Sequence, residues 1–111
     1  MDEHTTLKYL QDFIWHKDYG YTDTMNEQTL FRLMLKLTEE VDELSRAIHR
    51  GARYNDPDDI KGTIDEELYD ILYYTLCLAG LYGIDMEKTI ERKEALNAAR
   101  YPSSLVFEKD R

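Results

Sequence analysis

The sequence is poor in cysteine and in positive charge, and each scarcity excludes a class of protein. The single cysteine, Cys77, can form no internal disulfide, which fits a reducing cytoplasmic compartment. The formal net charge is -9, with 14 basic against 23 acidic residues. Non-specific binding to nucleic acid or to an anionic membrane needs a basic surface, so both are disfavoured. A phosphate-bearing ligand remains compatible, provided that metal ions neutralise the carboxylates.

A hydrophobic run of membrane-spanning length is also missing. The longest apolar stretch, residues 68–84, is short for a membrane span and contains Asp70 and four tyrosines. The first ten residues lack the apolar core of a signal peptide. We therefore expect one globular domain over residues 1–111, with a core over 26–101 and a loose tail over 102–111. At this size, oligomerisation often adds stability.

The hydrophobic pattern predicts an all-α protein, because no alternating strand pattern is present. N-cap residues and terminating glycines divide the chain into helical segments. Asn26, Thr63 and Asp85 are the expected N-caps, although a start near residue 56 is an alternative for the third helix. The fold is therefore predicted to be a four-helix bundle, with helices over about 4–17, 27–50, 64–82 and 86–99.

The segment 64–82 is apolar almost all the way round, yet it carries two acids close to its main apolar stripe. At about 100° per residue, Glu67 lies roughly 60° from Ile64, inside the stripe, and Asp70 lies at its edge. A buried carboxylate without compensation costs several kcal/mol. These acids therefore need a cation, a partner or a raised pKa.

The helix over 27–50 repeats this arrangement in the same register. Measured from Leu37, Glu40 lies about 60° away and Glu43 about 120° away. Two such helices would bring four carboxylates together, and these cannot all be ionised without cations. Oxygen ligands suit Mg²⁺ or Mn²⁺. Of the remaining acids, Asp42 and Glu66 are expected to be solvated.

Two other interpretations compete with a magnesium site. A Glu-x-x-Glu pair on a helix is commonly a solvated face. A di-iron carboxylate bundle is also built from inward-facing acids, but it needs Glu-x-x-His pairs. No histidine here has a glutamate three residues before it, which disfavours that site: His4, His16 and His49.

The last helix turns from apolar to cationic along one stripe. Lys93, Asn97 and Arg100 follow Ile90 on a face about 80° wide. This end of the helix either approaches an anionic ligand or places its cations favourably on the helix dipole. Lys36, one turn before Glu40, is a weaker candidate for a phosphate contact.

Together, these residues resemble the MazG-like all-α nucleotide pyrophosphohydrolases over about residues 28–102. That family carries E-E-x-x-E on one helix, E-x-x-D on the next and a K…N…R motif on a third. Asp42 is a departure, because many members have glycine there, but it should face outward. The matching residues in this chain are Glu39, Glu40 and Glu43, then Glu67 and Asp70, then Lys93, Asn97 and Arg100.

The resemblance implies hydrolysis of a nucleoside triphosphate to the monophosphate and pyrophosphate. A modified nucleotide, removed in a house-cleaning role, is one candidate substrate. Glu40, Glu43, Glu67 and Asp70 would hold Mg²⁺, with Mn²⁺ as an alternative. Glu39 and Glu40 are the expected catalytic residues. The expected phosphate contacts are Lys36, Lys93, Asn97 and Arg100.

A surplus of apolar surface on the central helix predicts a homodimer or homotetramer, with the central helices buried and sites near the subunit interfaces. The same surplus supports one alternative function, a non-catalytic helical interaction module. In that alternative the acids serve solubility only. The base that a nucleotide substrate would carry is not indicated; Phe13, Trp15, Tyr19 and Tyr21 are aromatic candidates for stacking.

Overall fold

The computed structural model describes residues 1–19, 26–55, 59–101 and 107, and these residues form four α-helices and no strand. The predicted all-α fold is therefore confirmed. None of the helices within these ranges is long and apolar enough to cross a membrane. The helices are α1 (Leu7–Tyr19), α2 (Glu27–Arg50), α3 (Ile64–Leu81) and α4 (Met86–Arg100).

Local hydrogen bonds explain where three of the helices begin. The side chain of Asn26 accepts a hydrogen bond from the backbone of Thr29, and Thr63 and Asp85 act in the same way before α3 and α4. Gly51 ends α2 in the left-handed conformation, with φ of 66°. These caps are the predicted ones. α3 begins at Ile64, directly after the Thr63 cap, so the alternative start near residue 56 is wrong. The predicted tail lies outside the described residues, apart from residue 107.

The first helix begins later than predicted, at Leu7 instead of about residue 4. The hydroxyl of Thr6 accepts a hydrogen bond from the Tyr9 backbone and so caps α1. The preceding residues form a separate turn, in which the Thr5 backbone N–H donates to the carbonyl of Asp2. This turn competes with an earlier start of the helix.

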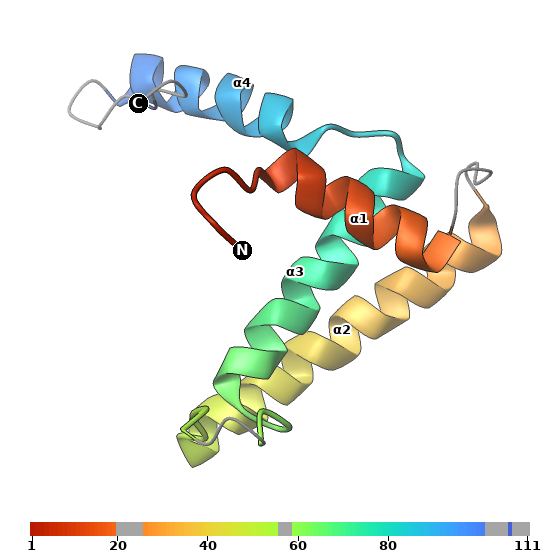
Figure 1. Cartoon of the computed structure of the whole chain (residues 1–111), viewed down its shortest axis with the longest axis vertical. Helices are drawn as coiled ribbons and strands as arrows, with labels where there is room; N and C mark the ends of the chain where they lie inside the picture. Colours follow the sequence, from red (N-terminus) through yellow and green to blue (C-terminus); the bar gives the residue numbers. More distant parts are fainter. Residues whose placement is uncertain (20–25, 56–58, 102–106, 108–111) are drawn as a thin grey trace.

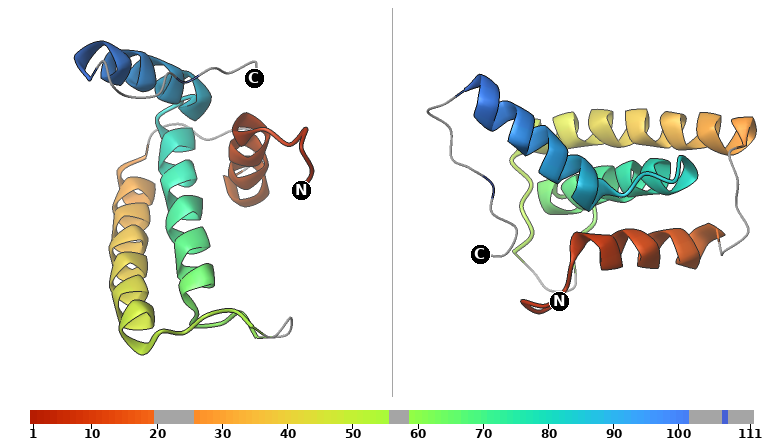
Figure 2. Two further views of the ribbon diagram at one scale, coloured as in Figure 1. Left: turned by 90° about the vertical axis from the view of Figure 1, so that its left-hand side faces the viewer. Right: turned by 90° about the horizontal axis from the view of Figure 1, so that it is seen from above.

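α3 lies between α2 and α1, as two views at right angles show (Figures 1 and 2). α2 and α3 form an antiparallel pair, and α4 packs against α1. The core where α1, α2 and α3 meet is built from Ile14, Leu33, Leu76, Cys77 and Leu81. This core joins the helices at one end of the α2–α3 pair and leaves the acidic residues toward its other end.

Parts of the predicted apolar stripes remain exposed within one protomer. Val41 and Ile48 on α2 are 52% and 57% exposed, and Leu68 on α3 is 54% exposed. By helical periodicity, all three lie on the apolar stripes of their helices, which predicts burial. The row of three helices explains the difference, because α3 is covered by α2 and α1 and no described helix of the same protomer covers this flank.

Candidate functional site

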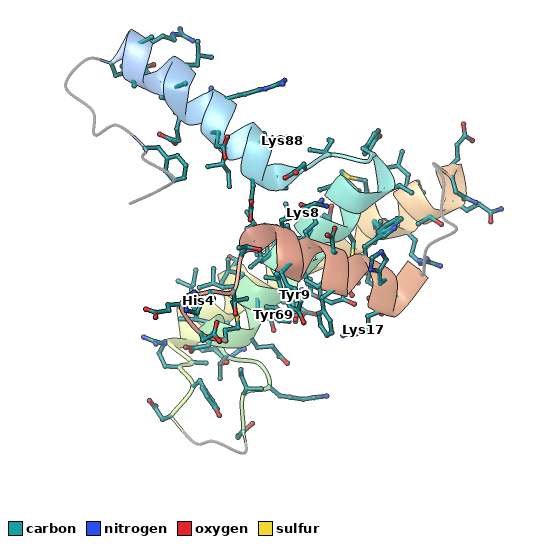
Figure 3. The ribbon with its side chains drawn as sticks, turned by 45° about the horizontal axis from the view of Figure 1, so that its top comes forward. His4, Lys8, Tyr9, Lys17, Tyr69 and Lys88 are labelled. Atoms are coloured by element: carbon teal, nitrogen blue, oxygen red, sulfur yellow. The ribbon has the colours of Figure 1, made fainter. Side chains whose placement is uncertain are left out.

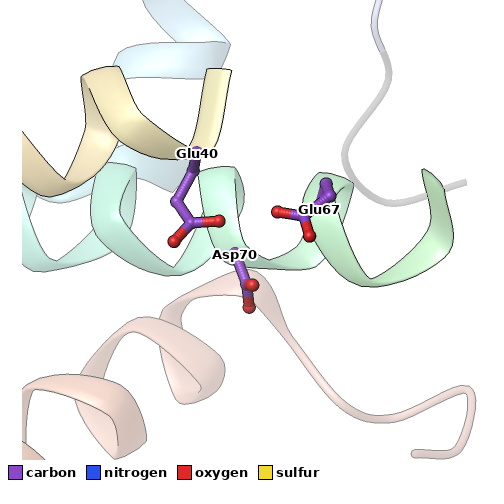
Figure 4. Close-up of side chains that lie close together, drawn as sticks. All are labelled: Glu40, Glu67 and Asp70. Carbon is purple, nitrogen blue, oxygen red and sulfur yellow. The ribbon is translucent and has the colours of Figure 1, made fainter. Parts of the chain in front are cut away.

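Three acids from neighbouring helices lie together, Glu40 on α2 and Glu67 and Asp70 on α3 (Figure 4). One carboxylate oxygen from each lies within 4.8 Å of the others. The spacing of three residues puts both α3 acids on the side that faces α2. Glu67 is only 4% exposed, and the other two are partly buried. We call these three residues the acidic cluster.

Two oxygens of the acidic cluster are buried without a hydrogen-bond partner, Oε2 of Glu40 and Oε2 of Glu67. An unsatisfied buried carboxylate oxygen is unfavourable in water-free surroundings. A bound cation would satisfy both oxygens at once. A donor set made only of carboxylate oxygens fits a hard divalent ion such as Mg²⁺ or Mn²⁺.

Burial and the neighbouring carboxyl groups raise the pKa values of the acidic cluster. Burial, followed by hydrogen bonding to Glu67, raises the pKa of Glu40 to about 7. Burial and the nearby charge of Glu40 raise the pKa of Asp70 to about 6. Burial likewise raises the pKa of Glu67. Without metal, the cluster therefore retains protons near neutral pH, which a divalent cation would displace.

Glu43 and Glu39 lie near the acidic cluster but are exposed on α2. Glu43 is outside the group of three, although its charge contributes to the raised pKa of both Glu40 and Glu67. The Nζ of Lys36 lies 3.5 Å from a carboxylate oxygen of Glu39. Lys36 therefore pairs with Glu39, three residues along the helix, and not with Glu40.

Glu66 is not simply solvated, as the sequence predicted. It is partly buried, and one carboxylate oxygen accepts a hydrogen bond of 2.9 Å from the Gly62 backbone. The Glu66 backbone in turn donates to the Thr63 hydroxyl. This reciprocal cap at the start of α3 draws the side chain back over the preceding loop. Asp42, in contrast, is exposed as expected, and it pairs with Arg46.

The cationic residues of α4 are not part of the acidic cluster of the same protomer. Lys93 and Arg100 are exposed on α4, and Asn97 is partly buried. α4 packs against α1 and lies beyond the end of α3 that is opposite Glu67 and Asp70 (Figure 1). The predicted motifs on α2 and α3 thus come together, whereas the motif on α4 stays apart within one protomer.

Next to the acidic cluster is an open cavity of about 300 Å³ that contains three cations missed in the sequence. Arg46 and Arg50 follow Glu43 by three and seven residues, so their helical spacing already indicated a shared face. Lys61 lies in the loop before α3, where no periodicity could reveal it. The lining residues are Glu43, Arg46, Arg50, Lys61, Gly62, Glu66 and Glu67. We call this space the basic cavity.

Comparisons with known proteins identify the family of the chain. A family model for the MazG nucleotide pyrophosphohydrolase domain matches residues 28–103, more than half of the chain. This chain belongs to that family. No curated protein sequence gives a significant match.

Crystal structures of a family relative show the same fold. Two structures of iMazG from Vibrio DAT 722 are each 39% identical to this chain. One covers 84% of this chain and 98% of the relative, with a TM-score of 0.72. The other covers 87% and 98%, with a TM-score of 0.74. As a MazG-family member, the chain is a hydrolase that acts on nucleotide phosphoanhydride bonds.

Aromatic side chains of α1 and α3 lie close together in this MazG-family protein, in the region where Figure 3 labels Tyr9, Lys17 and Tyr69. The Nζ of Lys17 lies 5.2 Å from the Tyr73 ring centroid and 5.8 Å from that of Phe13. The rings of Tyr69 and Tyr73 meet edge to face at 6.0 Å. Trp15 packs against the core instead. The Tyr19 side chain and Tyr21 lie outside the described residues.

Proposed function

We propose that this protein hydrolyses nucleoside or deoxynucleoside triphosphates to the monophosphate and pyrophosphate with the help of Mg²⁺. Glu40, Glu43, Glu67 and Asp70 would hold the metal, and Mn²⁺ would be an alternative ion. The observation that carries the proposal is the pair of buried, unpartnered oxygens of Glu40 and Glu67. Acids that served only solubility would lie on a solvated helix face, where water would satisfy these oxygens.

The residues around the acidic cluster supply the other requirements of the reaction. When bound, Mg²⁺ would neutralise the charge of the triphosphate and lower the pKa of a bound water molecule. Glu39, exposed one residue before Glu40, would orient and deprotonate the attacking water. Its ion pair with Lys36 would hold the carboxylate in place and give Lys36 access to phosphate oxygens.

A second copy of the chain would complete the site. The uncovered flank of α2 carries Met34, Val41 and Ile48, which are seven residues apart and therefore form one stripe. Leu68 continues the exposed apolar surface on α3. A homodimer, or a dimer of dimers, would bury this flank.

The same assembly would give α4 a role in catalysis. Because α4 lies beyond the far end of α3, Lys93, Asn97 and Arg100 would reach the triphosphate of a neighbouring subunit. Arg100 is suited to a bidentate phosphate contact. Base recognition would involve the aromatic side chains of α1 and α3, and a modified nucleotide is the proposed substrate in a house-cleaning role.

The proposal is tested by measuring pyrophosphate release from canonical and modified nucleotides with Mg²⁺, with Mn²⁺ and with EDTA. We expect metal-dependent release from a subset of the substrates. Glu40→Gln and Asp70→Asn should abolish release while the helical content is retained. Absence of release from the folded, oligomeric protein across the panel would contradict the proposal.

The exposed apolar flank also favours the second candidate, a helical interaction module without catalysis. In that case the flank would bind a partner, and the acids would contribute only solubility. This candidate predicts that divalent metal does not stabilise the protein and that Glu40→Gln has no functional effect. A thermal shift with Mg²⁺ in the wild-type protein, absent in Glu40→Gln, would exclude it.

A further inference from the structure

We propose that the basic cavity binds the terminal two phosphates of the substrate, with Arg50 and Lys61 as the principal ligands. The inference rests on the proposed function, and it assigns the pyrophosphate end of the nucleotide to residues within a single protomer. It adds cations from the end of α2 and from the loop before α3 to the phosphate contacts expected from α4.

The basic cavity borders the acidic cluster, because Glu67 belongs to both. Glu67 is 4% exposed, and its Oε2 is buried without a hydrogen-bond partner. An unsatisfied polar group therefore lies where the cavity meets the acidic cluster. A divalent cation held by Glu67 would therefore be bound at the edge of the basic cavity. The cavity volume, about 300 Å³, corresponds to about ten water molecules and is sufficient for two phosphate groups.

The charges that line the cavity explain why it would bind an anion only when metal is present. Three carboxylates, those of Glu43, Glu66 and Glu67, balance the three cations in the metal-free protein. Divalent metal at the acidic cluster would offset the carboxylates and leave the cations with a net positive charge. Pyrophosphate binding should therefore depend on Mg²⁺ and on the cations together.

Two of the three cations retain donors for a ligand. Arg50 donates one hydrogen bond of 3.2 Å, to the Gly62 carbonyl, and its guanidinium has further N–H groups free to bind phosphate. Lys61 is exposed and forms no ion pair with any residue in the described parts of the chain. Arg46 is already paired with Asp42 and is a weaker ligand.

This placement fits the proposed reaction. Water attacks the α-phosphorus, the bond from that phosphorus to the α–β bridging oxygen breaks, and the bridging oxygen leaves with pyrophosphate. The oxygen of water remains on the monophosphate, and its proton passes to a carboxylate and then to solvent. Arg50 and Lys61 would stabilise the charge that accumulates on the leaving pyrophosphate.

The inference is tested with Lys61→Gln and Arg50→Gln, with Arg32→Gln as the matched control. Arg32 is exposed on the same helix as Arg50 but does not line the cavity. Calorimetric titration with pyrophosphate, with and without Mg²⁺, gives a readout that does not depend on turnover. We expect at least about tenfold weaker Mg²⁺-dependent binding in each cavity variant, and no change in Arg32→Gln.

Arg50→Lys separates charge from structure, because it keeps the cation but weakens the contact to the Gly62 carbonyl. Partial recovery of pyrophosphate binding relative to Arg50→Gln supports the inference. Wild-type pyrophosphate affinity and wild-type KM in Lys61→Gln, in an enzyme that hydrolyses nucleotides, would overturn the inference and leave the proposed function intact. Failure of the wild-type protein to hydrolyse any nucleotide would instead overturn the proposed function.

Discussion

The carboxylate of Glu67 on α3 lies beside that of Glu40 on α2, and each has a buried oxygen without a hydrogen-bond partner. Antiparallel packing of α2 and α3 brings these two residues together. Burial, followed by hydrogen bonding to Glu67, raises the pKa of Glu40 to about 7. The arrangement is unfavourable for a protein without a cation and favourable for one that binds a divalent metal.

Glu67→Gln should separate the effect of this pair on catalysis from its effect on folding. We expect at least about a 100-fold loss of pyrophosphate release, because a metal ligand is removed. The metal-free variant should be as stable as the wild type or more stable, since one of two crowded carboxylates is neutral. Glu27→Gln, an exposed acid in the first turn of α2, is the control and should retain activity. Loss of fold in Glu67→Gln would contradict this account.

The metal-free protein should lose stability as the pH rises from 5 to 8. The folded-state pKa values of Glu40 and Asp70, about 7 and about 6, exceed their ordinary values of 4.5 and 3.8. The folded state therefore binds more protons in this window, and the free energy of unfolding falls as these groups ionise. We expect Tm to fall by roughly 5 °C or more, and by much less in Glu40→Gln.

Magnesium should reverse that trend, because the metal binds the ionised carboxylates. The stabilisation by Mg²⁺ should therefore be larger at pH 8 than at pH 5, as measured by thermal unfolding at both values. Equal stabilisation at the two pH values would place the bound ion away from Glu40 and Asp70.

Gly80 is required by the close approach of α1 to α3. A Cβ at this position would lie 2.5 Å from Cε3 and 2.7 Å from Cδ2 of Trp15. Gly80→Ala gains about 1 kcal/mol in helix propensity, but displacement of a packed indole should give a net loss of about 1–2 kcal/mol. Chemical denaturation measures the change. In a Trp15→Leu background the same substitution should become neutral or stabilising, and an unchanged loss would refute the steric cause.

A charged substitution at Val41 tests the proposed subunit interface. A surface substitution normally changes stability by less than about 0.5 kcal/mol. If a second subunit covers Val41, Val41→Asp should convert the oligomer to a monomer and reduce activity. Sedimentation equilibrium measures the assembly state, and Tyr9→Asp, at an exposed tyrosine of α1, is the control for the assembly state alone. A wild-type protein that is already monomeric would exclude the interface.

Mixing two inactive variants tests whether α4 acts on the neighbouring subunit. Glu67→Gln removes one carboxylate of the acidic cluster, and Arg100→Ala removes a proposed phosphate ligand on α4. Random reassembly of the two should restore about a quarter of wild-type activity if each site combines both subunits. No recovery, with mixed oligomers demonstrated by mass spectrometry, would place α4 and the acids of one site in the same subunit.

Sequence periodicity was sufficient to predict the helices and the juxtaposition of Glu40, Glu67 and Asp70, because a three-residue spacing fixes the helix face of each acid. It could not show that Val41 and Leu68 would stay exposed within one protomer, since an apolar stripe does not specify which helix covers it. It also missed Lys61, because a loop residue has no periodicity. Glu66 was predicted to be solvated because the pattern gave its helix face but not its hydrogen bond to Gly62.

The most direct test of the central claim is a titration of the metal-free protein with Mn²⁺, followed by electron paramagnetic resonance of the free ion. The account predicts saturable binding at pH 8 that is lost or strongly weakened in Glu67→Gln and competed by Mg²⁺. Wild-type Mn²⁺ affinity and stoichiometry in the folded Glu67→Gln variant would contradict the assignment of the acidic cluster as the metal site.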